Sequence, residues 1–154
     1  MSLVEPPAPP SPAPPSGLEQ LRAVMFGDWP YAGIGKTLGF YAIEVEEGRV
    51  LFGGDPGPDV YNPLGTVHGG YAATLLDSAC GCAVHSKLAG DQGYTTLELK
   101  IAYHRAMSAD TGPVRAEGKV VTLGRRAAFA EATLKDGQGR LLASATSTLL
   151  IFQR

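Results

Sequence analysis

Cysteine, tryptophan and charge are scarce in this chain of 154 residues. It contains two cysteines and one tryptophan, and charged residues make up 18% of it, below the roughly 25% typical of soluble domains. Cys80 and Cys82 are two positions apart, so on a helix their side chains point away from each other and cannot form a disulfide. The cysteine pattern fits a reducing compartment, and the scarcity of charge predicts a surface partly covered by a second copy of the chain.

Two classes of partner are excluded by further absences. The formal net charge is −2, so the chain lacks the strongly basic surface typical of nucleic-acid binding. No uninterrupted apolar run reaches the roughly 18 residues of a membrane span, and the N-terminus lacks the pattern of a signal peptide. We therefore expect a soluble, cytoplasmic protein that binds neither nucleic acid nor membrane.

A metal site is also not predicted. Cys80, Cys82 and His85 lie close together in sequence, but three weak ligands without a second pair are more typical of small core residues than of a zinc site. We expect no metal and no cofactor.

The N-terminal segment is rich in proline. Seven of the first fifteen residues are proline, and such a run forms neither helix nor sheet. We expect residues 1–16 to be a disordered tail and residues 17–154 to form a single domain, because a chain of this length usually forms one domain. Ser16 and Glu19 have the spacing of a capping box, which predicts a short helix that ends at Gly27.

The order of the remaining elements predicts the fold class. Alternation around Ile43 and a turn at Glu47-Gly48 predict a hairpin over 41–52, and residues 55–65 predict a shaped loop. Residues 69–87 are small and apolar on nearly all sides, which predicts a buried helix. Strand-like runs follow at 94–103, 114–123, 126–135 and 140–152. Without βαβ alternation, this order predicts an α+β domain in which an antiparallel sheet of five to six strands wraps one central helix.

Asp77 is the only charged residue between His68 and Lys87. A carboxylate in the middle of a buried helix is costly unless it is paired or protonated. One explanation is that the side of the helix that carries Asp77, Thr74 and Ser78 faces solvent. The other is that Asp77 is a general base or nucleophile whose pKa is shifted by desolvation.

The start of the same helix has the sequence His68-Gly69-Gly70. The first turn of a helix presents backbone N–H groups that have no partner within the helix. With glycine at two successive positions, a ligand oxygen can approach these amides without meeting a Cβ atom. The segment is a candidate oxyanion hole, although a simple turn before a helix explains it equally well.

The spacing of Gly69 and Asp77 constrains how they can act together. Eight residues on one helix correspond to roughly 12 Å, too far for both to act on one small reacting group. If they belong to one site, the acid must come from a second chain whose helix runs antiparallel to the first. A twofold dimer would then carry two equivalent composite sites.

The run from Asn62 to Asp77, with His68-Gly69-Gly70 at its centre, resembles the signature of hotdog-fold acyl-CoA thioesterases of the PaaI-like (phenylacetate-pathway) type. Residues 95–99, 103–105 and 124–126 are also similar to that family, and the resemblance covers about residues 36–152. It implies a hotdog fold, a homodimer or a dimer of dimers, and hydrolysis of an acyl-CoA to a free acid and CoA, with CoA being part of the substrate.

The resemblance also implies roles for individual residues. Asp77 would activate water or form a transient anhydride, and Gly69 would polarise the thioester carbonyl. His68 and Asn62 would position the carbonyl and the water, and Thr96, rather than its neighbour Thr95, would supply an assisting hydroxyl. Further substrate-binding positions are Gly70 beside the carbonyl site and, for the CoA phosphates, Arg105, Arg125 and Arg126 in the positively charged second half of the chain.

Two other functions remain open at this point. An acyl-CoA-binding or sensing module would use the same fold without turnover, but it would not require an acid inside the helix. The enoyl-CoA hydratases of this fold have an aspartate only a few residues before their histidine. In this chain Asp59 lies nine residues before His68. Both are therefore weaker hypotheses than thioester hydrolysis.

Overall fold

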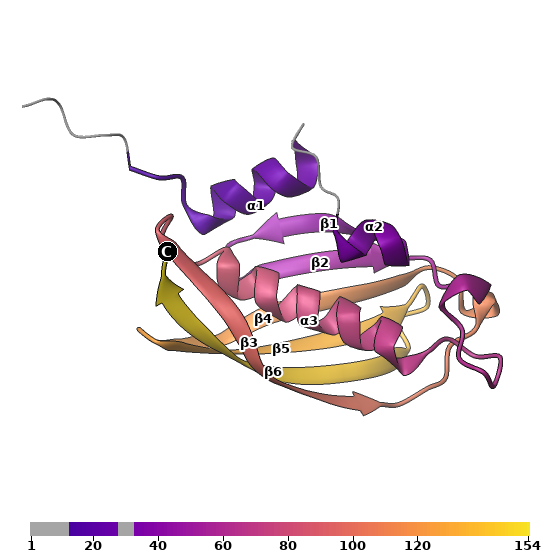
Figure 1. Ribbon diagram of the computed structural model, residues 1–154. Helices are drawn as coiled ribbons and strands as arrows, with labels where there is room; N and C mark the ends of the chain where they lie inside the picture. Colours follow the sequence, from indigo (N-terminus) through magenta and orange to yellow (C-terminus); the bar gives the residue numbers. More distant parts are fainter. Residues whose placement is uncertain (1–12, 28–32) are drawn as a thin grey trace, which may run out of the picture.

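A computed structural model describes residues 13–27 and 33–154 of the chain (Figure 1). Its helices are α1 (Gly17–Phe26), α2 (Ile34–Leu38) and α3 (Gly69–His85), with short 3₁₀ turns at Pro58–Val60 and Ala109–Thr111. Its strands are β1 (Phe40–Glu46), β2 (Arg49–Gly54), β3 (Gln92–Tyr103), β4 (Val114–Leu123), β5 (Ala127–Asp136) and β6 (Leu141–Gln153).

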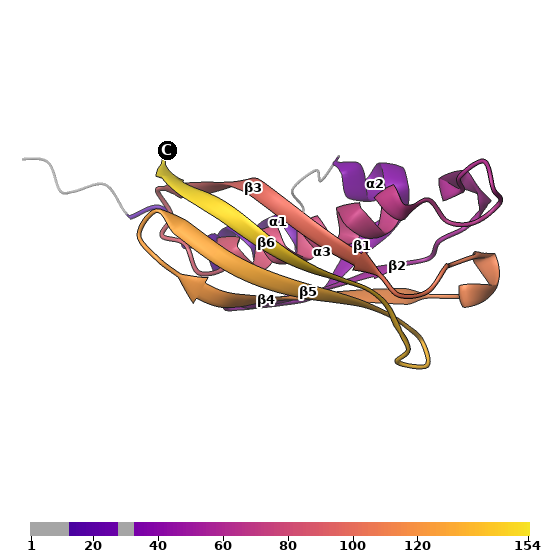
Figure 2. The same cartoon turned by 90° about the horizontal axis from the view of Figure 1, so that it is seen from below.

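The six strands form one antiparallel sheet in the order β1-β2-β4-β5-β6-β3. The sheet curves around α3, which lies against its concave face (Figure 1 and Figure 2). The predicted α+β architecture is confirmed, and so are the hairpin over 41–52, the central helix and the four later strands, each to within about two residues.

Small side chains on the concave face allow α3 to lie close to the sheet. Ala116, Ala130 and Ala132 are buried there, and Gly118 of β4 faces the backbone of Ala79 so closely that a Cβ atom would collide with it. Larger residues would push the helix away, because interiors are packed without spare volume. The helix is therefore held at a fixed depth against the sheet.

The two edge strands differ in how they are covered. Arg22 of α1 donates two hydrogen bonds, of 3.1 and 3.0 Å, to the carbonyl oxygen of Val45 in β1, and α1 runs along this edge (Figure 1). On β3, at the other edge, Leu97 and Tyr103 are 61% and 55% exposed. One edge of the sheet is thus capped by α1, and the other is open in the single chain.

The N-terminal predictions are confirmed in part. The Ser16–Glu19 capping box opens α1, and Gly27 ends it. Residues 13–16 are irregular, and the rest of the predicted tail, residues 1–12, lies outside the described residues, as do residues 28–32. The short helix α2 is not predicted from the sequence, because Gly33, Gly35 and Gly39 in and around it lower helix propensity.

Within residues 13–27 and 33–154, no helix is long and apolar enough to cross a membrane. Over the same ranges, no three His, Cys, Asp or Glu side chains are grouped closely enough to hold a metal ion.

Candidate active site

The loop before α3 is organised by Asn62. Its side-chain oxygen accepts hydrogen bonds from the backbone N–H of Leu64 (2.9 Å) and of Thr66 (3.2 Å), and its amide nitrogen donates to the Thr66 hydroxyl (2.9 Å). These contacts close a tight turn that leads the chain into the helix. In the single chain the Asn62 side chain is therefore used within its own loop, next to the predicted carbonyl site.

His68 caps the N-terminus of α3. Its Nδ1 atom accepts a hydrogen bond of 2.8 Å from the backbone N–H of Gly70. Because Nδ1 is the acceptor, the neutral ring carries its proton on Nε2. The side chain is exposed, so this Nε2–H is a donor available to a ligand beside the helix.

The backbone N–H of Gly69 is free. In the described part of the chain it has no hydrogen-bond partner, as expected for the first residue of a helix. Gly69 and His68 thus place two neutral donors at one helix terminus, where the helix dipole also favours negative charge. This arrangement can stabilise an oxyanion.

Tyr103, to which the sequence assigns no role, contacts the same turn. Its hydroxyl donates a hydrogen bond of 3.0 Å to the carbonyl oxygen of Gly69. The contact joins the end of β3 to the start of α3, and no local pattern in the sequence predicts it because the two residues are 34 positions apart.

Asp77 lies on the side of α3 that the sheet leaves uncovered. It is half-buried, as are Thr74 and Ser78 beside it. The predicted central helix is confirmed, and in the single chain the side at Asp77 is its partly exposed side. The apolar sides of α3 pack on the sheet, whereas this side consists of small and polar residues that the described elements cover only in part.

The Asp77 carboxylate is held from β3. The Thr96 hydroxyl donates a hydrogen bond of 3.0 Å to Asp77 Oδ1, whereas Thr95 is exposed. A bulge at Leu97 interrupts the pairing of β3 with β6 and shifts the strand by one residue, so that Thr96 and Leu99 face the same side. The choice of Thr96 over Thr95 therefore agrees with the contacts.

A cavity of about 270 Å³ opens beside the first turn of α3. The residues that line it come from α2, from the 3₁₀ turn at Pro58–Val60 with the residue after it, and from the start of α3. They are Leu38, Asp59, Val60, Tyr61, His68, Gly70, Tyr71 and Thr74. Its apolar and aromatic walls, next to the Gly69 and His68 donors, suit the acyl part of a thioester.

The three candidate arginines do not come together in one chain. Arg105 follows the C-terminal end of β3, whereas Arg125 and Arg126 lie in the β4–β5 turn near Gln92, at the N-terminal end of the same strand. All three are exposed. A single chain therefore offers two separate positive sites at opposite ends of β3.

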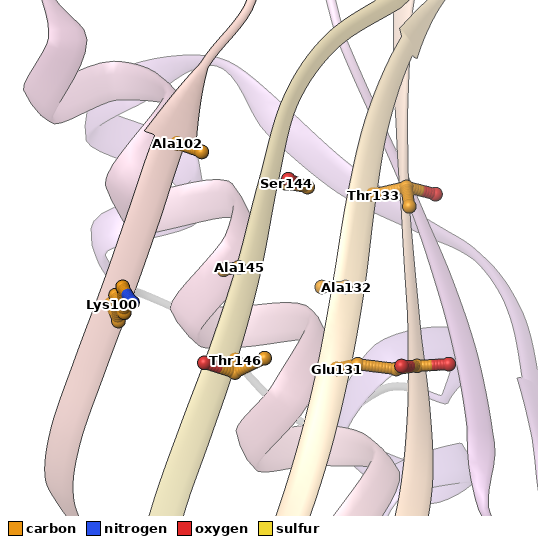
Figure 3. Close-up of a pocket in the computed structure, with 8 residues that line it drawn as sticks. All are labelled: Lys100, Ala102, Glu131, Ala132, Thr133, Ser144, Ala145 and Thr146. Atoms are coloured by element: carbon orange, nitrogen blue, oxygen red, sulfur yellow. The ribbon is translucent and has the colours of Figure 1, made fainter.

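Other features lie outside this region. A hollow of about 380 Å³ between Lys100 and Glu131 lies on the face of the sheet opposite α3 (Figure 3), too far from the helix terminus to share its chemistry. Cys80 and Cys82 are buried and free of disulfides, and burial raises the pKa of each thiol to about 12. Neither is suited to act as a nucleophile.

The chain is similar to known proteins in sequence and in fold. The family model described as the thioesterase superfamily matches residues 64–143. The 1,4-dihydroxy-2-naphthoyl-CoA hydrolase of Listeria monocytogenes is 25% identical over 119 residues, covering 77% of this chain and 95% of the relative.

Solved structures add to the same picture. A conserved protein of Pseudomonas aeruginosa is 30% identical, with a TM-score of 0.73 and coverage of 79% of this chain and 94% of that one. The PaaI protein from the phenylacetic acid degradation operon of Escherichia coli is 19% identical and shares the fold, with a TM-score of 0.76 and coverage of 88% and 94%.

Proposed function

Because this chain belongs to the thioesterase superfamily and is a thioester hydrolase, we propose that it hydrolyses acyl-CoA thioesters at composite sites, each built from two copies of the chain. The observation that carries the proposal is the Asp77 carboxylate, oriented by Thr96 on the open side of α3. No cofactor takes part, since CoA belongs to the substrate.

The residues around α3 supply what thioester hydrolysis needs. The Gly69 N–H and the Nε2–H of His68 bind the carbonyl oxygen and stabilise the negative charge that develops on it; one such donor is typically worth about 3 kcal/mol. Asp77 either removes a proton from the attacking water or attacks the carbonyl carbon itself to form an anhydride. In both routes the C–S bond breaks and CoA leaves as a thiolate, a stable leaving group. In the anhydride route a water molecule then hydrolyses the anhydride, which releases the free acid and restores the Asp77 carboxylate.

The need for two copies follows from the length of α3. Gly69 and Asp77 are about 12 Å apart along the helix axis, so one substrate carbonyl cannot reach both within one chain. A second copy whose α3 runs antiparallel beside the first would place its Asp77 near the first copy's Gly69. The partly exposed side of α3 and the edge strand β3 support this arrangement, because Thr96 of β3 bonds Asp77 on that side of the helix and the two surfaces are therefore adjacent.

The positions of the arginines support the same symmetry. Arg105 lies at one end of β3, and Arg125 and Arg126 lie at the other. In an antiparallel pair of β3 strands, the Arg105 end of one copy meets the Arg125 end of the other. We assign these guanidinium groups to the CoA phosphates, whose geometry they match.

A thiol-release assay tests the reaction. Purified protein is offered acyl-CoAs of graded length together with aryl-CoAs such as a dihydroxynaphthoyl-CoA, the substrate in the name of the Listeria relative. We expect turnover of at least one compound and its loss in Asp77→Asn, with the fold retained. Unchanged turnover in that variant, or binding of acyl-CoA without any thiol release, would contradict the proposal.

Mixing two inactive variants tests the composite site. An Asp77→Asn copy and a Gly69→Val copy, each inactive alone, are unfolded together and refolded as a mixture. A mixed dimer has one site with both substitutions and one site with neither, so about a quarter of wild-type activity returns if half of the dimers are mixed. If the acid and the amide belonged to the same chain, mixing would restore nothing.

A further inference from the structure

Tyr103 stands apart from the residues assigned above, because it contacts the backbone of the candidate oxyanion hole and not the reacting groups. Its hydroxyl donates to the Gly69 carbonyl oxygen at 3.0 Å. A Cβ atom built on Gly69 would lie 3.2 Å from both the Cζ and the hydroxyl oxygen of Tyr103, so the ring also packs directly against this residue.

The peptide between Gly69 and Gly70 is thereby held at both of its polar ends. Tyr103 binds its carbonyl oxygen, and His68 Nδ1 accepts from its N–H at 2.8 Å. The preceding peptide is fixed as well, because the carbonyl oxygen of His68 accepts from the Tyr71 N–H at 2.9 Å. Two successive glycines would otherwise leave this turn with more conformational freedom than any other pair of residues.

We propose that Tyr103 is a positioning residue that sets the direction of the two carbonyl-binding donors, the Gly69 N–H and the His68 Nε2–H. This inference rests on the proposed function of that turn. Tyr103 fixes the plane of the Gly69–Gly70 peptide and, through the Gly70 N–H, strengthens the hydrogen bond that keeps the proton of His68 on Nε2. Donors of an oxyanion hole are effective only when they are held in place before the reaction.

The same strand positions the acid. Thr96 near the start of β3 donates to Asp77, and Tyr103 at its end donates to Gly69. Both side chains face α3 because the bulge at Leu97 corrects the alternation between them. The strand β3 therefore uses two hydroxyl groups to hold both functional parts of the helix, the acid and the amide terminus.

The test uses Tyr103→Phe, which removes the hydroxyl and keeps the ring. We expect kcat to fall about tenfold, less than the roughly 100- to 1,000-fold loss from deleting a donor outright. We expect KM to change by less than about twofold, because the lost interaction acts mainly in the transition state. The melting temperature should stay within about 2 °C of wild type. Tyr41→Phe, which alters an exposed tyrosine on β1, is the matched control.

A spectroscopic measurement separates positioning from a general structural effect. In an Asp77→Asn background, the carbonyl stretch of a bound ¹³C-labelled acyl-CoA reports how strongly the carbonyl is polarised. We expect a shift to lower frequency on binding and a smaller shift when Tyr103→Phe is added. A wild-type kcat together with an unchanged shift in the Tyr103→Phe proteins would overturn this inference and leave the thioesterase function intact, whereas a wild-type enzyme without turnover would refute the function itself.

Discussion

Thr96 and Asp77 are 19 positions apart in sequence and are joined by a hydrogen bond of 3.0 Å from the threonine hydroxyl to one carboxylate oxygen. The bond crosses from β3 to α3 and fixes the carboxylate on the open side of the helix. It occupies Oδ1, whereas Oδ2 has no hydrogen-bond partner among the described residues and can accept a proton or attack a carbonyl carbon.

Replacing Thr96 by valine should therefore lower kcat by about 10- to 100-fold, less than the roughly 100- to 10,000-fold contribution of a general acid or base itself, because the acid remains and only its orientation is lost. The isosteric change removes the hydrogen bond and keeps the volume of the side chain. Thr95→Val is the matched control, because Thr95 is exposed beside it, and its kcat should equal that of wild type. Steady-state thiol release measures both, and equal losses in the two variants would refute the assignment of Thr96.

Gly118→Ala should destabilise the fold by about 1–3 kcal/mol, the usual cost of overpacking a core. The added methyl group would meet the carbonyl group of Ala79, which is backbone and cannot rotate away. Gly57→Ala provides the comparison, because nothing lies within 4 Å of a Cβ atom there, and we expect a change within about 0.5 kcal/mol. Urea unfolding followed by circular dichroism checks both values.

The two cysteines should not react with a disulfide reagent in the native protein at pH 8. Burial raises the pKa of Cys80 and Cys82 to about 12, so almost no thiolate is present, and both residues are buried. Two thiols should appear once the protein is unfolded in denaturant. Rapid labelling of the folded protein would show that α3 opens from the sheet.

Stability should fall as the pH drops below about 6.5, the unfolded pKa of a histidine, because of His85. Burial, and then the charge of Arg154, lowers the pKa of His85 in the folded state. The unfolded chain therefore takes up a proton at a pH at which the folded chain does not, and the free energy of unfolding decreases until the pH reaches the folded pKa.

A matched variant isolates this effect. His85→Gln keeps a polar group beside Gln20 and cannot titrate. Its free energy of unfolding should change less between pH 7.5 and pH 5.5 than that of the wild type. The same decrease in both proteins would assign the pH dependence to groups other than His85.

Local patterns in the sequence predict most of the secondary structure and the core of the candidate site. The alternation of apolar residues marks the strands, and the isolated charge of Asp77 and the His68-Gly69-Gly70 segment mark the helix on which the site is built. These signals are visible because each depends on neighbours within one turn or one strand.

The remaining features depend on contacts between distant segments. The bulge at Leu97 decides that Thr96, and not Thr95, faces α3, yet an uninterrupted alternation through Leu99 would turn Thr95 inward. Tyr103 reaches Gly69 from another element. The pattern of residues in α3 leaves open whether the side at Asp77 is exposed. Its exposure depends on which other segments pack against the helix, and these are distant in sequence.

The hydrogen bonds from Arg22 to Val45 have a consequence for how far such chains can assemble. A sheet with two bare margins can add copies on either side without limit, which is the route to fibres. Here the carbonyl oxygen of Val45 on β1 is occupied by Arg22 and α1 runs along this edge, so we expect strand addition at β3 and not at β1. Strand addition at β3 then stops once two copies are joined, because each copy has only one edge that accepts a strand. The long exposed edge strand β3 is therefore compatible with a closed dimer.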